Sequence, residues 1–447
     1  MSGKPDTGMM MELMERVWPL HRTLVHEDMD TTLDIVAEYL PAGHEWKVHR
    51  YPSGQKIWTW KVPEKFVVEK ARLELLTPNG PEKMVDFRDH VLHILSYSLP
   101  FEGELGWDEL APHLFTNPHR PKAIPWAFKY YDRDWGFSLP HEQWERLPRD
   151  GRYRVSIRTR FDPGFLSVGE FSIPGTSDEW LLFVCATCHP WQVNDSISGV
   201  VATVDFVRRE ADRLKAGGHR GYYGIKVLFL PETIGSLAFL ANNEPLIDKC
   251  RYAFFSEFLG NDDRFRLQRS LQGDTMVDRA TAYVLKQMTG GDFIDGPFCH
   301  TIITNDEKVT NAAGVNIPTV ALNRWPDGGW PFYHTTDDRP AAMNPDKIAE
   351  ASVLYEQVTE ILQTNVYPRR RFRGPLFLSG LKLDFDWQRD RRTKRGMQHL
   401  ILRLEGDISA LDIALQVDLD YADVVAVLEA MRNAGLVDLA HVPWPSA

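Results

Sequence analysis

The sequence has few cysteines and no long apolar run. Four cysteines in 447 residues are too few for a disulfide framework. Cys185 and Cys188 have the spacing of a C-x-x-C pair, but they lie at the end of an apolar run instead of opening a helix, so we expect buried thiols. No stretch approaches the length of a membrane span, and the segment around residues 9–11 lacks a secretory apolar region. We therefore expect a soluble, cytoplasmic protein.

Positive charge is also scarce. The chain has 51 Lys and Arg against 62 Asp and Glu, a net charge of -11. This balance argues against a general nucleic-acid binder and against a protein of anionic membrane surfaces. Hydrophobic residues make up 43% of the chain, which is ample for burial, and a chain of 447 residues predicts about two or three domains.

Two different patterns fill the first third of the chain. Residues 8–40 carry apolar stripes at helical spacing. From about residue 44 the sequence alternates in the manner of strands, as in residues 56–60, with turn signals such as residues 52–54 between the strands. We predict an inserted, small β-rich domain over residues 44–150.

Strand and helix signals then alternate as far as residue 366. Predicted strands cover residues 152–158, 180–185, 224–230, 251–256 and 315–321, and predicted helices cover residues 196–214, 235–243 and 345–364. This alternation predicts an α/β sandwich with a mixed, largely parallel central sheet. Residues 1–43 and 151–366 would form this domain together.

The end of the chain has a composition of its own. The segment after residue 366 is rich in arginine, and we predict a basic linker over residues 367–394. Helical patterns at 410–416 and 421–433, followed by a strand, are typical of a winged helix over residues 395–447. Winged helices often bind DNA, but this part has three arginines against eight Asp and Glu residues. Such a charge opposes binding to phosphate, so nucleic acid is not an expected partner and we favour a packing or protein-contact module.

The segment 188–199 is the most informative part of the sequence. It places His189 and Asp195 six residues apart, directly after an apolar run that predicts a buried strand. Ligands of open α/β sheets bind outside the carboxyl ends of the strands, and His and Asp are suitable ligands of zinc. On its own, the pair is better explained by a buried His and an Asp that caps the next helix.

Three more side chains of ligand or base type follow predicted strands or precede the last helix. Glu232 emerges after an apolar strand, although it could simply cap a helix. Glu257 lies within an apolar run, where a carboxylate without a partner or a metal is costly. His334 lies in a loop before the predicted helix 345–364, the last helix of the α/β domain. Each signal is weak alone, but the four sites in this order indicate one active site.

The motifs at these sites resemble a known clan. A His, Asn-Asp-x-x-Ser-Gly, a strand with Glu-x-x-Gly-Ser, a strand with acid-x-x-Gly, and Tyr-His-Thr-x-Asp-Asp follow the order of the zinc-dependent aminopeptidase clan. That clan includes bacterial leucyl aminopeptidases, glutamate carboxypeptidase and glutaminyl cyclase. Residues 52–54, 58–63, 97–100, 188–190 and 231–236 resemble more closely a bacterial aminopeptidase-like family with an inserted β domain and a C-terminal winged helix. The resemblance implies a zinc-exopeptidase-like three-layer sandwich.

The resemblance also implies a role for each site residue. Asp195 would be the central, metal-bridging carboxylate, and His189 and Glu257 would complete one zinc site with it. His334 would serve a second metal position, and Glu232 would be the general base. Zinc would polarise the scissile carbonyl and activate water, and the base would pass the proton to the leaving amine.

Two residues depart from the pattern of the clan. Thr233 stands where the clan has a second Glu, so Glu232 is either the base beside a weakened metal position or itself a ligand. We favour the base, which implies one tightly held zinc and leaves a second open. Trp191 stands where the clan has an Asp that orients the first His, so either another group takes that role or metal affinity is reduced. His300 is a reserve ligand that is better explained as structural.

Four further residues are candidate substrate contacts. Asp306 and Glu307 fall where the clan has acidic residues bordering the site, and they could hold a free α-amine or lie in a solvated loop. Arg324 could clamp a carboxylate or form an ordinary surface salt bridge. Tyr333 directly precedes His334 and is a candidate contact because it flanks that residue.

Three functions are compatible with these residues. The first is a zinc aminopeptidase-like hydrolase that acts on a small peptide or an aminoacylated metabolite. The second keeps the fold and changes the reaction to amide deacylation or acyl transfer in a biosynthetic pathway. The third is a non-catalytic protein whose winged helix binds a partner or DNA, against which the acidic balance of residues 395–447 argues. The sequence reveals neither the substrate nor whether the chain forms a homo-oligomer.

Overall fold

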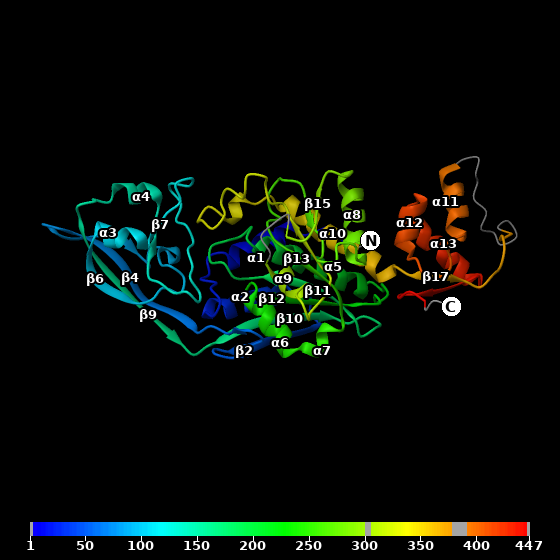
Figure 1. Ribbon diagram of the computed structural model, residues 1–447, viewed down its shortest axis with the longest axis horizontal. Helices are drawn as coiled ribbons and strands as arrows, with labels where there is room; N and C mark the ends of the chain where they lie inside the picture. Colours follow the sequence, from blue (N-terminus) through cyan, green and yellow to red (C-terminus); the bar gives the residue numbers. More distant parts are fainter. Residues whose placement is uncertain (1–2, 300–304, 378–390, 445–447) are drawn as a thin grey trace. The chain divides into compact units, whose positions relative to one another are not determined.

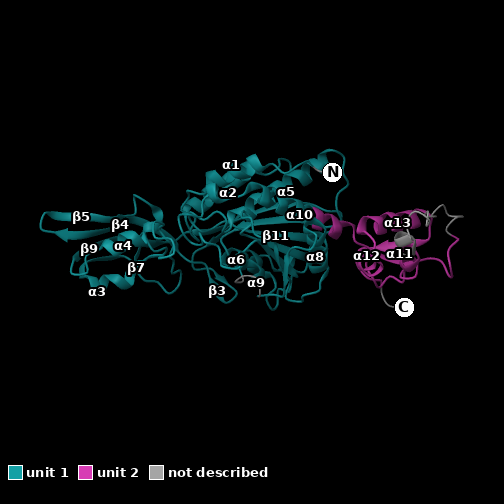
Figure 2. Ribbon diagram, turned by 90° about the horizontal axis from the view of Figure 1, so that it is seen from above, with its two compact units in different colours: residues 1–356 teal, residues 357–447 magenta. Residues whose placement is uncertain are grey.

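A computed structural model describes residues 3–299, 305–377 and 391–444 of the chain (Figure 1). It divides into two compact units, Met1–Glu356 and Gln357–Ala447 (Figure 2). No helix in the described part of the chain combines the length and the apolar character that crossing a membrane requires.

An eight-stranded mixed sheet forms the centre of the first unit. In spatial order its strands are β1 (Glu45–Pro52), β10 (Phe165–Ile173), β12 (Gly224–Leu230), β11 (Trp180–Ala186), β13 (Cys250–Ser256), β16 (Thr319–Asn323), β14 (Arg266–Gln268) and β15 (Ile294–Gly296). The middle strands β12, β11, β13 and β16 are parallel to one another, and β14 is parallel to β15. Antiparallel pairs join β1 to β10, β10 to β12 and β14 to β16. The predicted mixed α/β sheet is therefore confirmed.

Helices cover both faces of this sheet and make three layers (Figures 1 and 2). One face carries α1 (Thr7–Val17), α2 (Glu27–Tyr39), α5 (Ile197–Lys215) and α10 (Pro345–Thr364), and the other carries α6 (Ile234–Asn242) and α9 (Asp306–Thr310). Every residue of β12 is buried, as expected of a strand covered on both faces. The remaining helices of this part are α7 (Glu244–Ile247) and α8 (Met276–Thr289).

The start of α5 packs unusually close to the end of β13. A Cβ atom on Gly199 would lie only 2.0 Å from the carbonyl oxygen of Ser256. Only glycine permits this approach, so the Ser-Gly of the sequence motif brings the beginning of α5 against the residue that precedes Glu257.

A second sheet of four strands has the order β5-β4-β9-β6. Its strands are β5 (Gly80–Asp86), β4 (Lys65–Thr77), β9 (Arg152–Asp162) and β6 (Phe101–Gly106). Two strands differ from the expected domain membership. β1 was expected in the inserted β-rich domain and joins the central sheet, whereas β9 was expected in the α/β domain and joins the four-stranded sheet. Alternating polarity identifies a strand without naming its partner, which is why the sequence did not show this exchange.

Short elements lie in the connections between the longer strands and helices. They are β2 (Lys56–Ile57), β3 (Trp60–Lys61), β7 (Leu114–Phe115), β8 (Phe137–Ser138), α3 (Trp107–Leu110) and α4 (His141–Arg146), with single 3-10 turns at η1 (Val91–His93), η2 (Ala111–His113) and η3 (Pro340–Ala342). β7 pairs with β8, and β2 pairs with β3. None of these strands is longer than two residues, so side-chain packing rather than a ladder of backbone hydrogen bonds holds this region.

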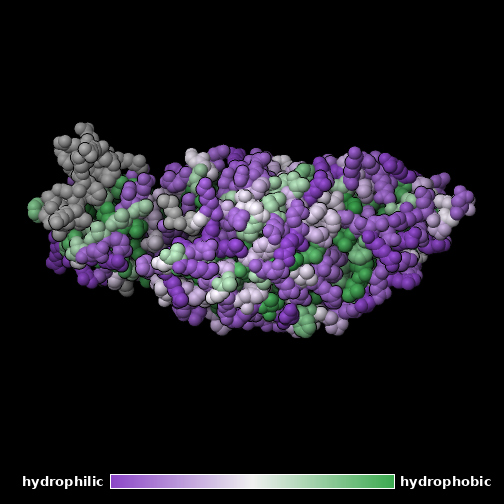
Figure 3. All heavy atoms as spheres, turned by 180° about the vertical axis from the view of Figure 1, so that it is seen from behind, coloured by the Kyte–Doolittle hydropathy of each residue, from purple (hydrophilic) through white to green (hydrophobic). Residues whose placement is uncertain are grey.

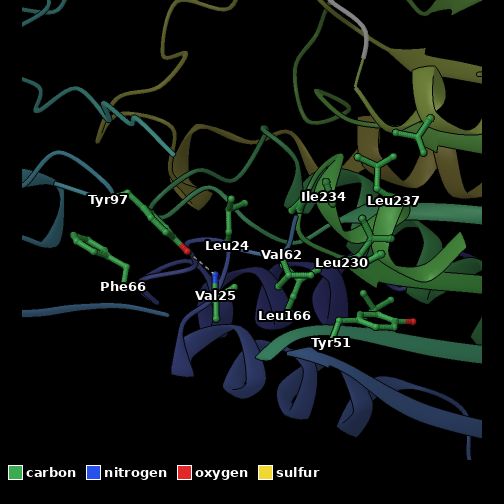
Figure 4. Packing of buried hydrophobic residues seen from close by; sticks show 14 of the residues in the cluster. Leu24, Val25, Tyr51, Val62, Phe66, Tyr97, Leu166, Leu230, Ile234 and Leu237 are labelled. Carbon is green, nitrogen blue, oxygen red and sulfur yellow. Dashed lines mark hydrogen bonds between the residues drawn. The ribbon is translucent and has the colours of Figure 1, made fainter. Parts of the chain in front are cut away.

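One hydrophobic cluster joins the four-stranded sheet to the central sheet. Figure 4 shows Phe66 and Tyr97 beside Val25, with Leu230 at the far side of the cluster. The buried Tyr97 hydroxyl accepts a hydrogen bond from the Val25 amide (3.3 Å) and donates one to the carbonyl oxygen of Glu64 (2.9 Å). Because the two sheets share this core, the first unit is continuous across both.

The second unit contains the end of α10 and five further elements. These are β17 (Tyr367–Arg370), α11 (Arg391–Ile401), α12 (Ala410–Val417), α13 (Tyr421–Asn433) and β18 (Val437–Ala440). β17 pairs antiparallel with β18, so the segment expected as a basic linker begins with a strand. Arg370 pairs with Glu405 and Arg371 with Asp438, which neutralises part of that basic segment. The order of helices and strand agrees with a winged helix, which stays a prediction.

The face of the molecule in Figure 3 is mainly hydrophilic, and its apolar residues form small separate patches. Among the described residues, the first unit has five exposed large aromatic side chains: Trp60, Phe128, Tyr131, Phe165 and Tyr333. Isolated exposed aromatics are ordinary on a protein surface, and only their neighbours decide whether they have a role.

Candidate active site

Five side chains gather at the carboxyl ends of the parallel strands and form what we call the strand-end cluster: His189, Asp195, Glu232, Glu257 and His334. The first two lie between β11 and α5, Glu232 follows β12, Glu257 follows β13, and His334 lies between β16 and α10. Neighbouring parallel strands end at the same edge of a sheet, so residues far apart in sequence meet there. The structure brings together the five residues to which the resemblance assigns the metal and the base.

Ligand-type atoms of this cluster lie close to one another. His189 Nε2 lies 3.3 Å from Glu232 Oε2, and His334 Nε2 lies 3.1 Å from Asp195 Oδ2. Ligand atoms of His189, Asp195 and His334 all lie within 4.8 Å of one another, and so do those of Cys188, His189 and Glu232. Glu257 belongs to neither of these groups. Imidazole and carboxylate at such separations are the donors that zinc prefers.

Burial governs the protonation of the cluster. Burial, reinforced by the charges of nearby carboxylates, raises the pKa of Glu232 and of Glu257 well above the usual range. Burial also lowers the pKa of His189 to about 4, so its imidazole is neutral and offers a lone pair to a metal. Burial alone would raise the pKa of Asp195, but the interactions with His189, His334 and Arg22 outweigh it, and the pKa of this carboxyl is lowered.

The residues present fit a divalent cation. Glu257 is only 1% exposed, and its Oε2 has no hydrogen-bond partner among the described residues. The Nε2 atom of His334 likewise makes no hydrogen bond of acceptable geometry, although it lies near Asp195. Buried polar atoms without partners are costly, and a bound cation is one way in which such atoms become satisfied.

Two buried residues fix the loop that carries His189 and Asp195. Arg22 donates hydrogen bonds to the carbonyl oxygens of Thr187 (2.7 Å), Cys188 (3.1 Å) and Gln192 (2.7 Å). On the other side of the loop, the Asp338 carboxylate accepts the backbone N–H groups of residues 193–195 at 3.0 to 3.2 Å. Asp338 closes the Tyr-His-Thr-x-Asp-Asp motif and had a signal in the sequence. Arg22 had none.

The backbone of the site is held in unfavourable conformations. Five residues of the site region that are not glycine have a positive φ: His189 (74°), Trp191 (59°), Thr233 (63°), Phe258 (52°) and His334 (52°). Each left-handed residue of this kind costs on the order of 1–3 kcal/mol, and such residues concentrate at functional sites. These residues surround the strand-end cluster. The fold therefore accepts an unfavourable backbone there in order to place the side chains of the cluster.

Trp191 does not replace the orienting Asp that the clan has at its position. Its ring packs against Trp18 (centroids 4.5 Å apart) and against His90 (4.2 Å). The second ring nitrogen of His189, Nδ1, lies 3.1 Å from the sulfur of Cys188 instead. The Cys188 sulfur, and not Trp191, therefore lies beside the ring nitrogen of His189 that needs an orienting partner.

Asp306 lies inside the fold rather than at a substrate surface. It is completely buried, and its Oδ1 accepts hydrogen bonds from the Thr233 amide (2.9 Å) and the Ser236 hydroxyl (2.5 Å). These contacts hold the turn that follows Glu232 and the first turn of α6. The expectation that Asp306 binds substrate is not supported by this position, because the side chain is fully buried and its Oδ1 already holds this turn.

Glu307 and Arg324 are engaged within the protein as well. Glu307 is buried and accepts hydrogen bonds from Gln268 Nε2 (2.8 Å) and the Asn305 amide (3.0 Å), and burial raises its pKa to about 7. The Asn305 side chain in turn donates to Glu257 Oε1 (2.8 Å). Arg324 is buried, pairs with Glu350 and donates to the carbonyl oxygen of Asp263 (2.6 Å). Neither side chain is presented as a free clamp for substrate.

Tyr333 is the predicted substrate contact that does lie at the surface of the site. Its ring is 39% exposed and stacks on His334, with centroids 3.8 Å apart. Phe258 and Trp325 pack beside it. His300, the reserve ligand, lies outside the described residues.

A segment between β7 and β8 supplies one wall of the site. The ring of Trp126 lies edge-on to both His189 (4.4 Å) and His334 (4.6 Å), and its backbone N–H donates to the His334 carbonyl oxygen (2.7 Å). Phe128, 41% exposed, stacks on Trp126 and also faces His334. Alternating aromatics at 126, 128 and 130 would have placed these rings on one side of an extended segment, but nothing in the sequence indicated which site they face.

Comparisons with known proteins agree with this architecture. The model of a family described as "Domain of unknown function (DUF4910)" matches residues 11–365. A curated relative from Clostridium acetobutylicum, described as "Putative polysaccharide biosynthesis protein with aminopeptidase-like domain", is 28% identical over 441 residues, which are 97% of this chain and 96% of the relative. A crystal structure from the same organism, described as a "putative peptidase", has a TM-score of 0.81 at 27% identity and covers 97% of this chain and 96% of its own.

More distant structures share the fold. BSAP, a zinc aminopeptidase from Bacillus subtilis, has a TM-score of 0.60 at 12% identity, over 79% of this chain and 93% of its own. A peptidase M28 precursor from Shewanella amazonensis has a TM-score of 0.55 at 12% identity, over 79% of this chain and 92% of its own. The expected zinc-exopeptidase-like three-layer sandwich is confirmed, and with it the resemblance to the zinc aminopeptidase clan.

Proposed function

The chain belongs to the family described as domain of unknown function DUF4910, and we propose that it is a zinc-dependent, aminopeptidase-like hydrolase. It would cleave an amide bond in a small peptide or an aminoacylated metabolite. The observation that carries the proposal is the convergence of two imidazoles and three carboxylates at the strand ends of a zinc-aminopeptidase fold. The descriptions of two relatives, one with an aminopeptidase-like domain and one as a peptidase, support the same class of reaction.

We assign the metal to the side chains that lie around Asp195. His189, Asp195 and His334 form a compact group, and Glu257 would add a carboxylate whose Oε2 is buried without a partner. The group supports one tightly held zinc. A second position stays open, because the clan's second Glu is here Thr233.

Glu232 would act as the general base. When bound, zinc lowers the pKa of a water molecule and polarises a carbonyl group. The Glu232 side chain keeps 20% of its surface exposed, so water and substrate can reach it beside His189. Its pKa is raised by burial and by the charges of Asp306 and Asp195, which makes the carboxylate a stronger proton acceptor. The same carboxyl would then return the proton to the leaving amine.

Substrate would lie along the aromatic side of the site. Tyr333 and Phe128 both contact the ring of His334 and are partly exposed, while the neighbouring Trp126 is buried. We keep Tyr333 as a substrate contact. Asp306, Glu307 and Arg324 are left out of the proposed contacts, because hydrogen bonds within the protein already engage them.

A second candidate is an amide deacylase or acyl-transfer enzyme of a biosynthetic pathway. The relative from Clostridium acetobutylicum is described as a polysaccharide biosynthesis protein. An aminopeptidase must also recognise a free α-ammonium group, and the two acids expected to do so, Asp306 and Glu307, are turned into the fold. Both observations favour an N-acylated amine, rather than a peptide with a free α-amine, as the substrate.

Metal analysis followed by a substrate panel tests the proposal. Protein purified without added zinc is expected to hold about one zinc per chain, since the site offers the ligands of a single catalytic zinc. Peptides with a free α-amine and N-acylated amines would then be compared, with and without a chelator. Cleavage of the peptides alone supports the aminopeptidase, and cleavage of the N-acylated amines alone supports the deacylase.

Two outcomes would contradict both candidates. The first is protein that holds no zinc after gentle purification and binds none on titration. The second is hydrolysis that a chelator leaves unchanged. Either result would mean that the buried carboxylates of the strand-end cluster serve another purpose.

A further inference from the structure

The sulfur of Cys188 touches two members of the strand-end cluster at once. It lies 3.1 Å from His189 Nδ1, and the backbone amide of Glu232 donates a hydrogen bond to it at 3.2 Å. Cys188 is 1% exposed, so neither contact is shared with solvent. One buried atom thus links the first proposed ligand to the proposed base.

The geometry of His189 indicates which way its hydrogen bond runs. Its Nε2 faces the cluster, 3.3 Å from Glu232 Oε2, and is the nitrogen that a metal would use. When one ring nitrogen of a neutral imidazole binds a metal, the other carries the proton and needs an acceptor. In the described structure, the Cys188 sulfur lies 3.1 Å from Nδ1 and would be that acceptor.

The amide of Glu232 is a donor under all conditions, because a backbone N–H cannot accept. This amide donates its hydrogen bond to the Cys188 sulfur. The next residue in the chain is Thr233, which has a positive φ of 63°. Sulfur accepts hydrogen bonds weakly, but a buried amide without any acceptor would be costly. The contact therefore helps to fix the turn from which the Glu232 side chain emerges.

We propose that Cys188 is a positioning residue that orients His189 for metal binding and holds the turn of Glu232. This proposal rests on the proposed function. In the zinc aminopeptidase clan, the first His is oriented by an Asp two residues later, and Cys188 would take over that role here. Trp191 stands at the position of that Asp, but its ring packs against Trp18 and His90 and does not orient His189.

Three variants test this role in the full-length protein. Cys188→Ala removes the acceptor, Cys188→Ser keeps a smaller one, and Cys185→Ala is the matched control. Cys185 is a buried cysteine of β11, and its sulfur lies beside Thr203. Zinc dissociation constants would be measured by competition with a chelator. We expect Cys188→Ala to weaken zinc binding about 10–100-fold, as removal of an orienting partner typically does.

Cys188→Ser is expected to restore part of the lost affinity, and Cys185→Ala is expected to match the wild type. Equal affinity in Cys188→Ala and wild type would overturn the proposal. So would an equal loss in Cys185→Ala, because it would point to general packing. A thiolate-to-metal absorption band in the cobalt-substituted protein would make Cys188 a ligand and would overturn the positioning role too.

A second readout does not depend on metal. In metal-free protein, ¹⁵N NMR of the His189 ring is expected to show the proton on Nδ1 in the wild type and a loss of that preference in Cys188→Ala. An unchanged tautomer in Cys188→Ala would count against the proposal. If the wild type bound no zinc, the proposed function would fail, while the tautomer would still decide the role of Cys188.

Discussion

Two groups of buried charge lie on the central sheet, and they differ in whether their charged atoms have partners. The β10–β12 cluster consists of His49, Glu170, Ser172 and Lys226. Glu170 pairs through one oxygen with Lys226 and through the other with His49 Nε2 (2.7 Å), and Lys226 also donates to the Ser172 hydroxyl (2.8 Å). In the strand-end cluster, by contrast, buried atoms of Glu257 and His334 have no partner in the described structure.

The pKa values of three glutamates express this difference. Burial on its own would raise the pKa of Glu170, but the hydrogen bonds from His49 and Lys226 outweigh it and lower the pKa to about 2. Burial raises the pKa of both Glu232 and Glu257 well above the usual range, because nearby carboxylates add to its effect. The pKa of a buried glutamate is therefore lowered in the β10–β12 cluster and raised in the strand-end cluster.

The contrast separates a structural role from a functional one. A buried carboxylate with two cationic or donor partners is compatible with a stable fold, whereas three clustered carboxylates repel one another until a proton or a bound cation neutralises them. Natural proteins retain such destabilising groups mainly where function requires them. On this reasoning the proposed metal would complete the strand-end cluster, whereas the β10–β12 cluster is complete as it stands.

The largest expected effect is the loss of hydrolysis in Glu232→Gln. Glutamine keeps the size of the side chain but cannot accept a proton, so kcat/KM on the best substrate of the panel should fall about 10²–10⁴-fold. Zinc content should stay that of the wild type, because the base role leaves the ligands in place. The measurement is steady-state kinetics together with metal analysis of the same preparation.

Glu244→Gln is the control for this substitution. Glu244 begins α7 and accepts a hydrogen bond from Trp58 Nε1 at an exposed position, away from the strand-end cluster. It should retain the wild-type kcat/KM. Wild-type kinetics in Glu232→Gln would exclude the base role, and loss of zinc in that variant would make Glu232 a ligand.

Breaking the β10–β12 cluster should affect stability and spare the metal. Lys226→Met keeps most of the side chain that lies over Trp180 but leaves Glu170 without its lysine. Removing one partner of a buried ion pair costs about 3–5 kcal/mol, and we expect the lower end of that range because His49 remains. The free energy of unfolding in urea and the zinc dissociation constant would be measured side by side.

Lys249→Met makes the same substitution in the exposed pair with Asp178. Exposed ion pairs contribute little, so this control should unfold like the wild type. A weaker zinc affinity in Lys226→Met would argue against the separation of the two clusters. Wild-type stability in that variant would mean that the β10–β12 cluster is not the structural one.

Removing zinc should have a somewhat smaller effect on stability. A ligand that binds only the folded state at 100 times its dissociation constant stabilises the protein by about 2.7 kcal/mol. We therefore expect the Tm to fall on addition of a chelator and to recover with zinc. Lys226→Met should lose the same increment, because the two clusters share no partner. An increment that vanished in this variant would show that the clusters are coupled.

The sequence predicted the elements of the central sheet well wherever burial is complete. The apolar run 224–230 is β12, and the pattern 345–364 is α10, both with the expected bounds. The meeting of His189, Glu232 and Glu257 also followed, since parallel strands end on one edge of the sheet. Such features depend on local pattern and simple topology alone.

Partners distant in sequence were not predictable. Arg22 reaches the carbonyl oxygens around Cys188 from a segment more than a hundred residues away, and Trp126 reaches both imidazoles. A single sequence contains no record of which side chains pack together. For the same reason Asp306 and Arg324 seemed available to substrate, although each is buried and hydrogen-bonded inside the fold.

The smallest expected effect is a gain in stability when Glu257→Gln is examined without metal. Glutamine keeps the acceptor for Asn305 Nδ2 (2.8 Å from Glu257 Oε1 in the wild type) and removes a buried carboxylate that nearby Asp195 and Glu232 disfavour. Relief of such a functional conflict commonly adds about 0.5–2 kcal/mol, to be measured by urea unfolding of metal-free protein. With zinc present the order should reverse, because the variant lacks a ligand. If metal-free Glu257→Gln were less stable than the wild type, Glu257 would belong with the structural charges of the β10–β12 cluster, and the contrast between the two clusters would fail at this residue.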